Sequence, residues 1–152
     1  MTTTATFPRP PRGLSQYKQD QLEQLVKFTA CEAGILPEQI YGPCSSPYQV
    51  RYRRAIMWAM REGYRMTLQS IGQCFRGRGG KLMHHSSVIH ALKIIKDLEA
   101  ADYWDGKGWG IIAPSGVFIP ADTDQIEALA IVADKHNRMN PPIQLPTTWT
   151  RN

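Results

Sequence analysis

The sequence contains no apolar run that approaches the ~20 residues a helix needs to cross a bilayer. Its first residues, MTTTATFPRPPRG, lack the apolar core of a secretory signal segment. Cysteine is scarce: Cys31, Cys44 and Cys74 are an odd number without the spacing of a disulfide framework. We therefore expect reduced thiols, no contact with a membrane and a cytoplasmic location.

Motifs for catalysis and metal binding are also missing. The chain has no CxxC or HExxH, and His84, His85 and His90 do not have the i, i+4 spacing of a helical ligand pair. Residues 76–81, RGRGGK, resemble a phosphate-binding loop, but no Ser or Thr follows Lys81 and no buried strand precedes the segment. We therefore expect no enzymatic activity, no metal and no cofactor.

Acidic residues are almost absent from residues 51–96. This block has ten Lys and Arg and one acid, Glu62, a local charge of +9, whereas the remaining residues hold eight bases and twelve acids, or −4. A positive block between acidic segments indicates a polyanionic partner. A solvated charged face is the alternative, but such faces usually mix both signs.

Two amphipathic segments joined by a basic, glycine-bearing connection lie inside this block. Thr67 can cap the first, whose apolar positions are Leu68, Ile71 and Phe75. The second should place one stripe inward, made of Val88, Leu92, Ile95 and Glu99. The side opposite that stripe is small or hydrogen-bonding and consists of Ser86, Ser87, His90 and Lys93. The pattern is typical of a helix-turn-helix, in which the start of the second helix meets base edges.

At these residues the sequence resembles the C-terminal DNA-binding domain of the bacterial chromosomal replication initiator DnaA. Ser70-Ile71-Gly72 with Phe75 resembles that domain's "xIGxxF" helix, and residues 84–91, HHSSVIHA, resemble its signature "Asp-His-Thr-Thr-Val-Leu-His-Ala". Upstream, residues 53–58 resemble its "Arg-Gln-x-Ala-Met" helix. The resemblance spans about residues 22–98 and implies a mainly α helical bundle with a helix-turn-helix that binds double-stranded DNA.

Three departures from the family pattern affect what this chain is expected to read. The loop at residues 43–48 is neutral where the family has a basic loop that enters the minor groove. Phe75 and His85 are ten steps apart instead of five, and the five extra residues bring positive charge. His84 replaces the family's acidic residue, which can accept from cytosine N4. The resemblance therefore implies a DNA sequence different from the initiator's own recognition box.

The remaining segments complete the expected organisation. We predict a flexible basic arm at 1–13, a helix-turn-helix domain at 14–100 and a C-terminal extension at 101–152. Helices are expected at about 15–32, 37–42 and 49–62, with core faces made of Leu22, Leu25, Val26 and Thr29, and of Ala55, Ile56, Ala59 and Met60 with Trp58 at the border. The extension should contain an aromatic, glycine-rich loop, a short hairpin or extended loop at 111–120, a helix at about 123–138 and a proline-rich tail. That helix should bury Ile126, Leu129, Ala130 and Ala133, against the domain or against another subunit.

These patterns lead to one functional prediction and one alternative. The predicted base-reading residues are His85, Ser86, Ser87, His90 and Ala91. The predicted phosphate-binding residues are Arg51, Arg53, Arg54, Arg76, Arg78, Lys81 and Lys93. The protein would bind double-stranded DNA sequence-specifically, as a regulator or accessory replication factor of a phage or mobile element. The alternative is a structural or adaptor protein of a larger assembly, such as a virion, that uses the helical fold and its C-terminal extension for protein contacts.

Overall fold

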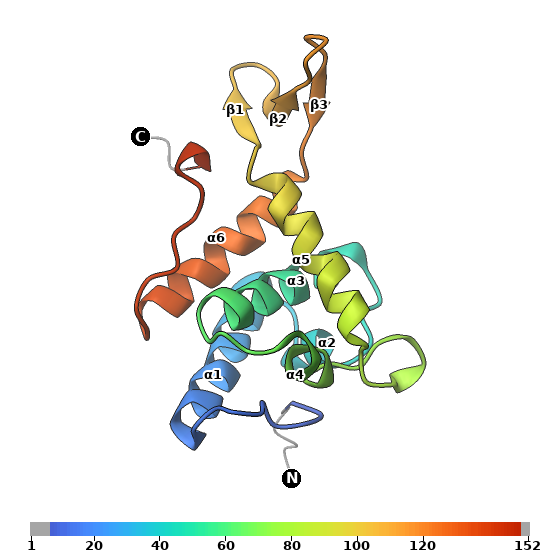
Figure 1. Ribbon diagram of the computed structural model, residues 1–152, viewed down its shortest axis with the longest axis vertical. Coiled ribbons are helices and arrows are strands. Elements are labelled where there is room, and N and C mark those ends of the chain that lie inside the picture. The colour runs from blue at the N-terminus through green and yellow to red at the C-terminus, as the bar shows by residue number, and fades with distance from the viewer. Residues whose placement is uncertain (1–6, 150–152) are drawn as a thin grey trace.

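A computed structural model describes residues 7–149 as six α-helices and a small antiparallel sheet (Figure 1). The helices are α1 Gln16–Ala33, α2 Pro37–Tyr41, α3 Pro47–Glu62, α4 Leu68–Gln73, α5 His85–Leu98 and α6 Thr123–Asn137. The strands are β1 Asp102–Trp104, β2 Gly108–Ile112 and β3 Phe118–Pro120, and 3-10 turns cover Arg78–Gly80 and Thr147–Trp149. The expected mainly α fold is confirmed. Within residues 7–149, no helix is long and apolar enough to span a membrane.

Local capping explains where the helices begin and end. The Ser15 side chain accepts from the Lys18 N–H and starts α1, and Gly34 ends it in the left-handed conformation with φ 73°. Helix α3 begins at Pro47, two residues before the predicted start, because Ser46 caps it and proline is favoured in the first helical turn.

Helix α3 is the centre of the core. It packs against α1, α4, α5 and α6, which lie around it in Figure 1. The predicted core faces of α1 and α3 are buried, and Trp58, expected at the border, is buried as well with 7% of its surface exposed.

Helix α6 docks on α3 and α1 of its own chain, so its residues enter the same core cluster as those of α3. Ile126, Leu129 and Ala133 are buried as predicted. The prediction for Ala130 is wrong: this residue is exposed and Val132 is buried in its place. The buried stripe is centred between Leu129 and Val132, and Ala130 falls outside it.

The sheet is a three-stranded meander in the order β1-β2-β3, which projects beyond the end of α5 (Figure 1). The expected hairpin at 111–120 is formed by β2 and β3. Residues 102–104 were expected in a loop but form β1, because Gly106, with φ 78°, allows a tight turn back into β2. Trp109 and Ile111 pack against the cluster of Leu98, Ala101 and Ile126. Trp149 of the tail donates from Nε1 to the Ala101 carbonyl at 3.1 Å. The sheet and the tail are therefore fixed to the C-terminal end of α5.

The N-terminal segment was expected to be a flexible arm, of which residues 1–6 lie outside the described residues. The rest packs on the domain: the Phe7 ring is buried at centroid distances of 4.8 Å from Tyr41 and 6.4 Å from Phe75. The Arg12 N–H donates to Ser70 Oγ at 3.0 Å. Residues 7–12 are thus held against α2 and α4.

Candidate nucleic-acid interface

Helices α4 and α5 pack closely through a glycine contact. The Thr67 side chain accepts from the Ser70 N–H and starts α4, as predicted. A Cβ atom on Gly72 would lie 2.6 Å from the Met83 carbonyl oxygen, closer than real Cβ atoms come to any neighbour. Glycine at position 72 therefore lets the backbone before α5 lie directly on α4.

The extra residues between α4 and α5 form a small closed loop. The Met83 N–H donates to the Phe75 carbonyl at 3.0 Å, and Arg76 pairs with Leu82 in an isolated antiparallel bridge. The insertion therefore leaves the ends of the connection adjacent, and the loop projects beside the start of α5 (Figure 1). Its three exposed basic side chains are Arg76, Arg78 and Lys81.

The first turns of α5 expose a polar surface. His84 caps the helix through Nδ1, which accepts from the Ser86 N–H at 3.2 Å, and its ring lies 4.0 Å from that of His85 between centroids. Four predicted base-reading residues are exposed: His85, Ser86, Ser87 and His90. The predicted phosphate-binding residue Lys93 is exposed on the same helix.

Ala91, the fifth predicted base-reading residue, is only 6% exposed. The buried stripe of α5 is Val88, Ala91, Ile95 and Leu98, so the expected stripe through Leu92 and Glu99 was misplaced by one position. Leu92 is half-buried, and Glu99 is exposed at the end of the helix. Because α5 packs on α3 as well as on α4, its buried face includes Ala91.

A hollow of about 320 Å³ lies between α3 and α5. Arg54 of α3 faces Ser86, Ser87 and His90 of α5 across it, and the rest of its lining is Arg53, Met57, Met83 and Ala91. Partial burial lowers the pKa of the Arg54 guanidinium, an effect that nearby Asp122 opposes. The hollow contains hydrogen-bond donors and no carboxylate among its lining residues, and such a surface suits an anion.

Arg53 borders this hollow but lies almost wholly inside the protein. It is 6% exposed, and its guanidinium donates to the Ile40 carbonyl at 2.8 Å and to the Gly42 carbonyl. It also lies 5.4 Å from the centroid of the Phe75 ring, and burial lowers its pKa. The structure gives Arg53 a packing role in place of the predicted phosphate contact. Its position in the sequence could have predicted this burial, because helical spacing places Arg53 on the same face as the core residues Ile56 and Met60.

Arg51 is also engaged inside the protein. Its Nε lies 2.9 Å from an Asp122 carboxylate oxygen, and its Nη1 lies 3.8 Å from Asp124. The Gln125 side chain donates to the Arg51 carbonyl at 2.8 Å. The prediction treated Arg51 as a free charge, but the acidic start of α6 neutralises it. Arg51 and Asp122 are 71 residues apart in the sequence, so no local sequence pattern predicts their contact.

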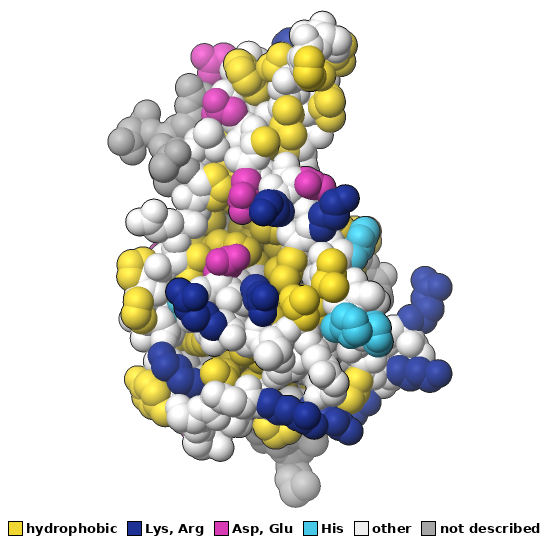
Figure 2. Space-filling model, viewed as in Figure 1, with side chains coloured by type: hydrophobic (Ala, Val, Ile, Leu, Met, Phe, Trp, Pro, Cys, Tyr) yellow, Lys and Arg dark blue, Asp and Glu magenta, His cyan; other side chains and the backbone are white. Residues whose placement is uncertain are grey.

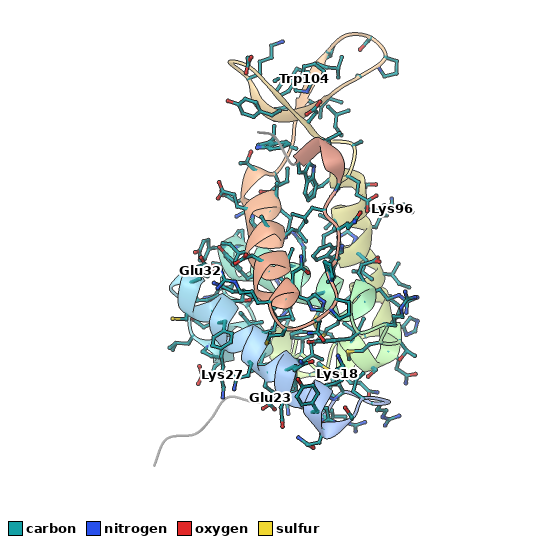
Figure 3. All side chains as sticks on the ribbon, turned by 90° about the vertical axis from the view of Figure 1, so that its left-hand side faces the viewer. Lys18, Glu23, Lys27, Glu32, Lys96 and Trp104 are labelled. Carbon is teal, nitrogen blue, oxygen red and sulfur yellow. The ribbon has the colours of Figure 1, made fainter. Side chains whose placement is uncertain are left out.

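The remaining charges are distributed unevenly over the surface. Figure 2 shows dark-blue basic side chains without magenta ones over the lower part of this face and beside the cyan histidines, whereas higher up basic and acidic side chains lie side by side. Helix α1 instead mixes both signs, with Lys18, Glu23, Lys27 and Glu32 along it (Figure 3). The mixed face of α1 is typical of a solvated surface, and the region around the start of α5 differs from it in carrying one sign.

Comparison with known proteins gives a partial match. No protein-family model matches the chain, and no solved structure matches it. The chain is similar to the chromosomal replication initiator protein DnaA from two strains of Thermus thermophilus, with 31% identity over 83 residues to each. The match covers 55% of this chain and 18% of each initiator, so the chain spans less than a fifth of these relatives.

Proposed function

We propose that α4, its connection and α5 form a helix-turn-helix like that of the DnaA C-terminal DNA-binding domain. The protein would be a cytoplasmic, non-enzymatic protein that binds double-stranded DNA in a sequence-specific manner. The observation that supports this most is the exposed polar start of α5 inside a surface of one charge sign. In helix-turn-helix proteins this part of the second helix enters the major groove.

In this arrangement the base-reading residues are His85, Ser86, Ser87 and His90. Serine hydroxyls and imidazole nitrogens both donate and accept hydrogen bonds, so they suit the mixed pattern of base edges in the major groove. Ala91 is not included, because it is buried on the inner stripe of α5. Its methyl group instead lines the hollow between α3 and α5.

The phosphate-binding set is smaller than the sequence suggested. Arg51 is paired with Asp122 and Arg53 is buried, so neither is available for the DNA backbone. The five that remain are Arg54, Arg76, Arg78, Lys81 and Lys93. If each of them neutralises one phosphate, the logarithm of the binding constant should fall with the logarithm of salt with a slope of about −4.5.

The biological role proposed with this activity is that of a transcription regulator or accessory replication factor of a phage or mobile element. The similarity to replication initiators over about half of the chain favours a link with replication. His84 at the helix cap and the basic loop that contains Arg78 change the surface next to the bases. The DNA sequence recognised should therefore differ from the initiator's recognition box.

Selection of bound sequences from a random duplex pool tests the proposal. The wild-type protein should enrich one motif, and the double variant Ser87→Ala with His90→Ala should lose that enrichment. A matched control is Gln24→Ala with Ser115→Ala, two exposed polar residues on α1 and on the β2–β3 turn. The control should enrich the same motif as the wild type. Failure of the wild type to enrich any sequence would overturn sequence-specific binding.

A structural or adaptor role is the second candidate, and the sheet favours it. The sheet and its turns expose large apolar side chains, among them Trp104 at 38%, Val117 at 59% and Ile119 at 51%. Exposed apolar surface of this kind is common at protein–protein contacts. Gel filtration separates the two candidates: a mass that rises only with duplex favours DNA binding, and a mass above that of a monomer without duplex favours protein contacts.

A further inference from the structure

We infer that residues 7–12 are an anchored part of the interface and that Arg9 binds a backbone phosphate on the α4 side of α5. This inference rests on the proposed DNA-binding function and adds a contact that the helix-turn-helix alone does not supply. It also replaces the expectation of a flexible arm, for the part of the segment that the structure describes.

Two contacts and one buried proline fix the segment. The Phe7 ring is buried in an edge-to-face arrangement with the Tyr41 ring, at 4.8 Å between centroids. Pro11, four residues further along the chain, is also buried. The Arg12 N–H donates to Ser70 Oγ of α4 at 3.0 Å. Arg9 lies between these anchors and is exposed. A side chain between two fixed points of backbone loses less freedom on binding than one on a free tail, so it can contribute more to affinity.

Arg9 lines a second hollow of about 450 Å³. Its other lining residues are Gln69 and Gln73 of α4, Leu82 and Met83 of the connection, and His84 and His85 at the start of α5. The polar members of this lining are an arginine, two amides and two imidazoles, and none is a carboxylate. Within residues 7–149 the Arg9 side chain has no ion pair and no hydrogen bond. Its charge is therefore available to an anion, and a guanidinium is well suited to phosphate oxygens.

The two hollows adjoin different residues at the beginning of α5. Met83 lines both of them, while Ser86, Ser87 and His90 line the hollow with Arg54, and His84 and His85 line the hollow with Arg9. A helix in the major groove has one DNA strand on each side of it. Arg54 is therefore placed for the backbone of one strand and Arg9 for the backbone of the other.

The salt dependence of duplex binding, measured by fluorescence anisotropy, tests this assignment. Arg9→Gln should make the log–log slope shallower by about 0.9 and weaken binding about eight-fold at 0.1 M salt, which is the share of one phosphate contact. The matched control is Arg138→Gln, at the end of α6, which should keep the wild-type slope. The wild type and Arg54→Gln are measured beside them.

The outcomes separate the inference from the function on which it rests. If the wild type binds duplex, Arg54→Gln weakens binding and Arg9→Gln does not, the contact by Arg9 is overturned while the proposed function stands. If the wild type does not bind, both are overturned.

A double-variant cycle tests the anchoring. Arg9→Gln should weaken binding much less when Phe7→Ala has already released the segment. If Arg9→Gln reduced the duplex affinity equally in the wild-type and Phe7→Ala backgrounds, Arg9 would contribute only through long-range charge. That result would overturn the anchored contact.

Discussion

The same substitution at two neighbouring arginines of α3 should affect different properties. At Arg53 it should lower stability, and at Arg54 it should weaken DNA binding. Arg53→Met removes two charge-assisted hydrogen bonds, to the carbonyls of Ile40 and Gly42, each contributing roughly 1.5–3 kcal/mol. Relief of the buried guanidinium's desolvation offsets part of this loss. We expect a net destabilisation of about 2–4 kcal/mol, and therefore a Tm roughly 5–15 °C lower for a chain of this size.

Arg54→Met is the matched comparison, because the Arg54 side chain lines the same hollow between α3 and α5 but is only partly buried. This variant should keep its unfolding free energy within about 0.5 kcal/mol of the wild type, as surface changes usually do. It should bind duplex more weakly and with a shallower salt slope. Chemical unfolding followed by circular dichroism, and duplex binding at a temperature where both variants are folded, measure the two effects. An Arg53→Met variant of unchanged stability and weakened DNA binding would refute the buried packing role.

Three further predictions concern single residues. Gly72→Ala should cost about 1–3 kcal/mol in thermal unfolding, because the new methyl group would overlap the Met83 carbonyl; an unchanged Tm would contradict this close contact. Burial lowers the pKa of His136, which packs against Tyr64, so stability should be complete above pH ~6.5 and decline as pH falls below it, by at most about 1.4 kcal/mol per pH unit. His136→Leu should flatten that decline, and an equal decline in both proteins would assign it to other groups. His84→Ala should lose about 1 kcal/mol of helix capping, whereas His84→Asp should keep the cap and change the selected DNA sequence; the same motif from His84→Asp would show that position 84 does not affect readout.

The helices could be predicted from the sequence because their signals are local. Thr67 caps α4 as expected, Ser15 and Gly34 bound α1 close to the expected range of 15–32, and the spacing of apolar residues in α1 and α3 placed their core faces. The buried face of a helix could not be predicted where the helix packs against two neighbours. Ala91 turned inward because α5 packs on both α3 and α4, and a periodic pattern does not say how many neighbours a helix has.

The candidate site was predictable in its polar residues and not in its charges. Ser86, Ser87 and His90 lie on the exposed side of α5 as expected. The local charge of residues 51–96 counted every base as free, yet Asp122 pairs with Arg51. Such long-range pairings, like the placement of Arg9, arise only when segments distant in the sequence meet. No spacing rule reports them.

The most direct test of the account is the affinity of the wild-type protein for a duplex over a range of salt concentrations. With Arg54, Arg9 and the four other basic residues of the proposed interface engaged, the log–log slope should be about −5.4. A slope near zero, or no binding at low salt, would contradict a nucleic-acid interface around α5.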